Sequence, residues 1–126
     1  MKINDKLIPK PKILYLNNNG SNGNITLNDD VSNYNYLEIF YTDNQKTMNA
    51  STKIVTPNNK MFLLTFVNNY KQANGTIYNY LYIKKMKASG NTLTKELETY
   101  LQINTTTITS LREADYIYIT KVLGYK

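Results

Sequence analysis

The stretch TIYNYLYIKKMK, residues 76–87, decides the fold class of this 126-residue chain. Side chains alternate across a β-strand. In a strand here, one face would carry aliphatic residues and the other a stripe of tyrosines, namely Ile77, Leu81 and Ile83 opposite Tyr78, Tyr80 and Tyr82. A strand with two apolar faces is central in a stack of two layers, or it is covered on its second face by another chain.

The rest of the chain repeats this pattern. YLEIFY, residues 36–41, alternates in the same way, with Tyr36, Glu38 and Phe40 opposite Leu37, Ile39 and Tyr41. Turn-forming clusters of Asn, Gly and Pro separate short runs of Ile, Val, Tyr, Phe and Thr, which is typical of meanders, sandwiches and barrels. We predict strands at residues 12–16, 24–28, 35–42, 50–56, 61–67, 76–87, 99–104 and 116–124. The predicted fold is an all-β, antiparallel β-sandwich, for which a jelly-roll-like arrangement stays open.

Two segments depart from this pattern. TLTKELETYL, residues 92–101, places leucines at helical spacing. We favour strand or loop there, with at most a short helical turn, because its neighbours on both sides are strand-like. The opening KLIPKPK contains two prolines, which fix φ and remove hydrogen-bond donors. We therefore predict an extended lead-in or linker over residues 1–11 and a single β-sandwich domain over residues 12–126.

The composition excludes several kinds of catalysis. The chain has no histidine and no cysteine, which removes Ser-His-acid, Cys-His and His-metal chemistry as well as disulfides and thiolate metal sites. Nine carboxylates remain. The adjacent pair in NDD, residues 28–30, is interpreted as a turn, because neighbouring residues on one loop do not by themselves form a calcium or glycosidase site. We expect no enzymatic activity, no cofactor and no metal site.

Neither a membrane-spanning apolar stretch nor the apolar run of a signal peptide is visible. We therefore expect a soluble protein with no membrane partner. The formal charge of +6 favours anionic partners, but most lysines are dispersed, which is typical of a solvated surface. One cluster, Lys84, Lys85 and Lys87, is a candidate contact for an anionic polymer. Alternation places Lys84 on the face opposite the other two, so a single basic face is not assured.

The tyrosines are the most informative side chains. Exposed aromatic rings on a sheet stack on sugar rings or form the centre of a protein interface. Pairing across strands within a half-buried face is the alternative, which we favour for most of them. The candidates for interface or glycan contact are Tyr78, Tyr80 and Tyr82 on one strand, with Tyr116 and Tyr118 on the last strand.

Three segments carry a resemblance to a known family. They are ILYLNNNGSNGNITLNDDVSNYNYLEIFYTDNQ (13–45), STKIVTPNNK (51–60) and DYIYITKVLGYK (115–126). They resemble the C-terminal β-domain of tail-fibre, baseplate or minor structural proteins of tailed phages and prophages of low-GC Gram-positive bacteria. The similarity covers most of residues 13–126 and consists of structural motifs. The chain departs from the family pattern in YKQANGTIYNYLYIKKMK (70–87) and in TLTKELETYL (92–101).

The resemblance implies a β-sandwich-like virion component, commonly part of a homotrimeric appendage, made in the bacterial cytoplasm without a signal peptide. We expect a non-enzymatic structural module for assembly, host-surface attachment or both, with other virion proteins as partners. A carbohydrate-binding module that uses surface tyrosines is the alternative. Candidate receptors are a host cell-wall polysaccharide or teichoic acid, and no nucleic acid is expected. Apolar residues on both faces of 35–42, 76–83 and 116–123 predict a homo-oligomer, and the resemblance favours a trimer.

Overall fold

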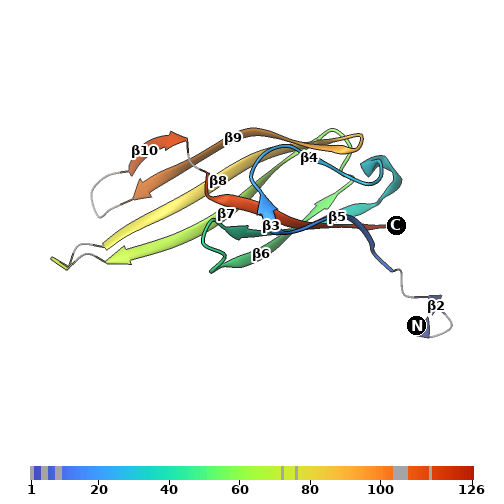
Figure 1. Ribbon diagram of the computed structural model, residues 1–126, viewed down its shortest axis with the longest axis horizontal. Helices are drawn as coiled ribbons and strands as arrows, with labels where there is room; N and C mark the ends of the chain where they lie inside the picture. Colours follow the sequence, from blue (N-terminus) through green and yellow to red (C-terminus); the bar gives the residue numbers. More distant parts are fainter. Residues whose placement is uncertain are drawn as a thin grey trace.

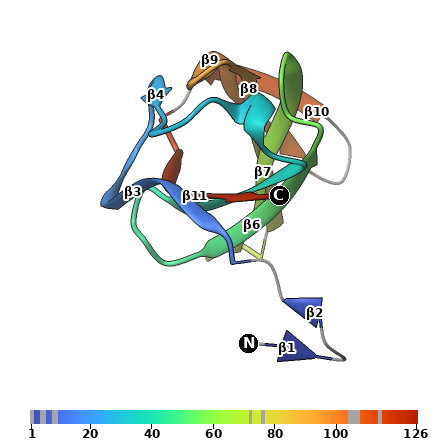
Figure 2. The ribbon, with the colours of Figure 1, turned by 90° about the vertical axis from the view of Figure 1, so that its right-hand side faces the viewer.

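Two antiparallel sheets pack face to face around a common core (Figures 1 and 2). The computed structural model describes residues 2–3, 6–7, 10–71, 73–75, 77–103, 108–113 and 115–126. The predicted all-β antiparallel sandwich is confirmed. Before it, β1 (Lys2–Ile3) and β2 (Lys6–Leu7) pair with each other in a separate two-stranded sheet, and β3 begins at Lys12. The remainder of the predicted lead-in lies outside the described residues, apart from Lys10 and Pro11.

The first sheet, called the β11 sheet, has the strand order β3-β11-β5-β6. Its strands are β3 (Lys12–Ser21), β11 (Ile117–Tyr125), β5 (Tyr36–Asp43) and β6 (Asn49–Val55). The last strand of the chain therefore lies between two strands from its first third. The second sheet, called the β8 sheet, has the order β10-β9-β8-β7, and β4 also pairs with β9. Its strands are β4 (Ile25–Thr26), β7 (Lys60–Lys71), β8 (Ile77–Ser89), β9 (Thr92–Ile103) and β10 (Ile108–Glu113).

The core forms because alternate residues of both sheets are apolar and point inward. In the β11 sheet, Leu37 and Ile39 of β5 are fully buried, and so is Ile119 of β11. In the β8 sheet, Leu64 of β7 and Met86 of β8 are equally buried. Burial of each such side chain contributes roughly 1.5–3 kcal/mol, so the alternation recognised in the sequence is the main determinant of the sandwich.

The segment 92–101 is a strand throughout, and no helical turn forms there. A register shift of β9 against β8 makes Glu96 an extra residue, a β-bulge, because Lys85 pairs with Leu97 while Met86 pairs with Lys95. Leu93 therefore faces the core, whereas Leu97 is exposed. Strand β10 was not expected from the sequence.

NDD forms the predicted turn. Asp30 caps a single 3-10 turn, η1 (Val31–Asn33), and its side chain accepts a hydrogen bond from the Ser32 N–H at 2.9 Å. Asp29 accepts a hydrogen bond from the Tyr34 hydroxyl at 2.8 Å. The Tyr34 ring lies directly against Gly124 of β11, where a Cβ atom would be 2.6 Å from the ring. This turn therefore docks the η1 loop onto the last strand.

Candidate functional site

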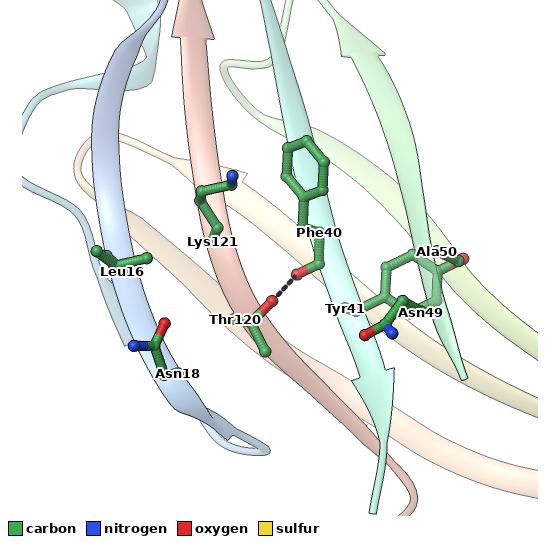
Figure 3. A pocket seen from close by; sticks show the side chains of 8 residues that line it. All are labelled: Leu16, Asn18, Phe40, Tyr41, Asn49, Ala50, Thr120 and Lys121. Atoms are coloured by element: carbon green, nitrogen blue, oxygen red, sulfur yellow. Dashed lines mark hydrogen bonds between the residues drawn. The ribbon is translucent and has the colours of Figure 1, made fainter. Parts of the chain in front are cut away.

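The outer face of the β11 sheet carries a shallow hollow with a volume of about 280 Å³ (Figure 3). It lies where the pairing of β11 with both neighbours shifts register between Ile119 and Lys121. Against β5, Thr120 is the extra residue of a β-bulge, whereas residues 17–20 of β3 lie opposite it on the other side. The Thr120 hydroxyl donates a hydrogen bond to the Phe40 carbonyl at 3.3 Å. The lining residues are Leu16 and Asn18 of β3, Phe40 and Tyr41 of β5, Asn49 and Ala50 of β6, and Thr120 and Lys121 of β11.

Two lysines of this outer face lie over aromatic rings. Lys121 Nζ is 4.5 Å from the centroid of the Phe40 ring, and Lys53 Nζ is 4.0 Å from the centroid of the Tyr36 ring. The Tyr36 ring in turn stacks on Tyr125, with centroids 4.5 Å apart and planes at 9°. Such cation–π contacts attract an ammonium group without neutralising its charge. The face therefore combines aromatic surface with positive charge.

The outer face of the β8 sheet exposes large apolar side chains alongside Lys85 and Lys87. Its exposed large apolar side chains are Met61, Leu63 and Val67 of β7, Ile77 of β8 and Leu97 of β9, and together they are called the apolar outer face. The strand register does not place Leu63 beside Leu97, because Lys85 pairs with both and lies between them, whereas Val67 pairs directly with Leu81. Half-buried Leu81 and Leu101 continue the same face. Large apolar side chains exposed on one face of a sheet typically mark an interaction surface.

The predicted tyrosine stripe of β8 lies on the inner side of its sheet, because it shares a face with buried Met86. The Tyr82 ring stacks on Tyr116, with centroids 3.5 Å apart and planes at 11°, and also on Tyr100 at 5.5 Å. Tyr80 contacts both Tyr82 and Tyr100. Burial raises the pKa of the Tyr82 and Tyr116 hydroxyls. These rings pair with one another across strands, which is the arrangement that the sequence analysis favoured for most of the tyrosines.

The structure separates the remaining tyrosine candidates from this group. Tyr78 is half-buried at the far end of β8, and Tyr118 packs its Cβ against Gly20 of β3. Tyr116 and Tyr118 therefore contact different parts of the sandwich. A role for any of the five tyrosines in an interface or in glycan contact stays a prediction.

The lysine cluster does not form one basic surface. Lys84 is completely buried and forms an ion pair with Glu98, with Nζ and Oε1 3.2 Å apart. Its Nζ also donates to the backbone carbonyls of Ile117, at 3.1 Å, and of Asn22. Burial lowers the pKa of Lys84, and the Glu98 carboxylate opposes that shift. The expectation that Lys84 contacts an anionic polymer is therefore corrected, whereas Lys85 and Lys87 point to the outer face and stay candidates.

Glu98 completes a network that ties the β8 sheet to the start of β11. Its carboxylate accepts hydrogen bonds from the backbone N–H groups of Tyr116 and Ile117, at 2.5 and 2.9 Å. It also accepts one from the side-chain amide of Asn22 at 2.8 Å. Every partner of this buried pair is a group of the fold itself, so we assign it a structural role.

Within the described ranges, no group of three or more acidic residues is placed to hold a metal ion. In the same part of the chain, no helix has the length and apolar character needed to cross a membrane. Comparison with protein-family models and with curated proteins gave no match.

Sequence reasoning did not identify the hollow as a site. It placed Tyr36, Glu38 and Phe40 on one face of a strand, which is where they lie. It could not show that Asn18, Asn49 and Lys121 converge beside Phe40, because they come from separate strands and the bulge at Thr120 leaves no pattern in the sequence.

Proposed function

We propose that the chain is a non-enzymatic structural module of a phage virion, of the tail-fibre or baseplate type, that assembles with copies of itself. The apolar outer face is the observation that carries the assembly part of this proposal. Leu63 and Val67 on β7 and Leu97 on β9 expose between 46% and 62% of their surface to solvent. A closed cyclic assembly would bury this face without leaving a contact that propagates into fibres. The family resemblance supports the virion assignment and a trimer.

The oligomeric state tests this proposal. We expect light scattering at micromolar concentration to give a mass of three times the 14.6 kDa of one chain. Leu63→Glu should dissociate the assembly, because a carboxylate buried in an apolar interface pays a large desolvation cost. Val55→Glu is the matched control, since Val55 is 56% exposed and Leu63 is 55% exposed, and both lie on edge strands of opposite sheets. A wild-type monomer, or equal effects of the two variants, would contradict the proposed interface.

Two further observations would test the virion assignment and the non-enzymatic part of the proposal. Genes for tail proteins on either side of this gene would support it. Turnover of a polysaccharide or peptidoglycan by this chain, lost when a single carboxylate is replaced, would overturn the non-enzymatic part of the proposal.

A further inference from the structure

The hollow on the β11 sheet contains a cation, the Lys121 ammonium, that no carboxylate of the described residues neutralises. Among the described residues, Lys12, Lys84 and Lys95 lie within 4.0 Å of carboxylate oxygens, whereas Lys121 does not. Lys121 is half-buried and its ammonium is positioned by the Phe40 ring. Its three N–H donors favour an anionic group that enters the hollow.

Glu38 lies on the same face, two residues before Phe40 on β5. It accepts hydrogen bonds from the Tyr125 hydroxyl at 3.2 Å and from the Ser51 hydroxyl at 3.4 Å. Both donors lie outside the residues that line the hollow. The lining itself therefore carries one positive charge and no negative charge.

The other lining residues offer the kinds of contact that a sugar ring and its hydroxyl groups make. Phe40 and exposed Leu16 offer apolar surface, against which the C–H face of a pyranose ring packs. Asn18 and Asn49 are both exposed and stand on β3 and β6, on opposite sides of the hollow (Figure 3). An amide offers two donors and an acceptor, which is what sugar hydroxyls require. In the described part of the chain, neither side-chain amide has a hydrogen-bond partner, so both are available to a ligand.

The size of the hollow limits the ligand. Pockets for drug-sized molecules occupy roughly 300–1,000 Å³, and this hollow, at about 280 Å³, falls just below that range. It also stays open to solvent along the sheet. One monosaccharide unit fits such a space, and further units of a chain would continue over the sheet surface.

We propose that this hollow binds an acidic sugar unit, one that carries a carboxylate or a phosphate. Lys121 binds the anionic group, Phe40 and Leu16 pack against the ring, and Asn18 and Asn49 bind hydroxyls. This site lies on the sheet opposite the apolar outer face. It is therefore independent of the proposed assembly and should bind equally well in the Leu63→Glu variant.

Titration of the isotope-labelled protein, followed by NMR, tests the site with four probes: glucuronate, glucose 6-phosphate, glucose and inorganic phosphate. We expect one or both acidic sugars to bind, with shifts confined to residues 16–18, 40–41, 49–50 and 120–121. The pair of acidic sugars distinguishes a carboxylate from a phosphate ligand. Glucose and inorganic phosphate should bind at least about tenfold more weakly, since each lacks one half of the contacts.

Two lysine variants supply the matched comparison. Lys121→Met should weaken binding of the acidic sugar at least about tenfold, the effect expected for loss of a charged hydrogen bond. Lys53→Met should change it less than about twofold, because Lys53 also lies over a ring on this face but outside the hollow. Equal losses in both variants, shifts centred elsewhere, inorganic phosphate binding as tightly as the sugar phosphate, or no binding of either acidic sugar would each overturn the proposal.

Discussion

Replacing the buried pair of Lys84 and Glu98 tests whether this pair fixes the last strand to the β8 sheet. Glu98→Leu leaves the Lys84 ammonium at 0% exposure without its counter-charge. Removing one partner of a buried pair typically costs about 3–5 kcal/mol of unfolding free energy. Lys84→Met leaves the Glu98 carboxylate with the Lys95 ammonium, 3.9 Å from its Oε1, and should therefore cost less than Glu98→Leu. Native domains are stable by about 5–15 kcal/mol, so either loss is a large fraction of the total.

The double variant Lys84→Met/Glu98→Leu is the informative one. Replacing both partners of a buried pair with apolar residues is often neutral or stabilising. Here the pair also binds the buried backbone N–H and C=O of Ile117, and each buried polar group left without a partner costs about 1–3 kcal/mol. We therefore expect the double variant to lose about 2–6 kcal/mol, less than the sum of the single losses because no charge is left unpaired.

Urea unfolding followed by circular dichroism measures these losses. Lys87→Met is the control, since Lys87 points to the opposite face of β8, and it should change the stability by no more than about 0.5 kcal/mol. A double variant as stable as the wild type would refute the reasoning. It would show that the hydrogen bonds from the pair to the Ile117 backbone make no net contribution to the free energy of unfolding.

Gly124→Ala should lower the free energy of unfolding by about 1–3 kcal/mol, because the alanine Cβ would lie 2.6 Å from the Tyr34 ring. An unchanged midpoint of thermal unfolding would contradict this. Hydrogen bonds from Tyr34 and Asp30 lower the pKa of Asp29 to about 2, so the stability that Asp29 contributes is present above about pH 4 and is lost as the pH falls towards 2. Asp29→Asn should reduce the slope of unfolding free energy against pH between about pH 4 and 2. An unaltered slope would argue against the lowered pKa of Asp29. Burial and the Asp29 carboxylate raise the pKa of Tyr34 to about 12, so its contribution is present below about pH 10 and is lost as the pH rises to 12. Tyr34→Phe should remove a phenol that ionises near pH 12 in an absorbance titration, and an unchanged ionisation step near pH 12 would rule this out.

The sandwich was predictable because its determinants are local. Alternation in residues 36–41 and 76–87 separated core positions such as Leu37 and Ile39 from the outer face, and these two are completely buried. The helical spacing of leucines in residues 92–101 was misleading. In a regular strand Leu93 and Leu97 would share a face, but because of the bulge at Glu96 they lie on opposite faces. No pattern in the local sequence indicates this bulge.

The candidate sites were less predictable because they depend on pairing between distant residues. Alternation separated Lys84 from Lys85 and Lys87, but it could not show that Lys84 lies opposite Glu98 on the neighbouring strand. The hollow beside Phe40 needs the register of β11 against two strands at once. Such registers are set by tertiary packing rather than by local propensity.

The position of β11 has a consequence for how the chain is made. Strands β3 and β5 do not pair with each other, and each has β11 as its neighbour in the sheet. The inward-facing residues of β3 and β5 therefore cannot pack beside β11 until residues 117–125 have left the ribosome. Strands β7 to β10 form a meander of neighbours in the sequence, and such local contacts form quickly. We expect the β8 sheet to form during translation, while the other half of the sandwich stays open to chaperones until residues 117–125 have been made.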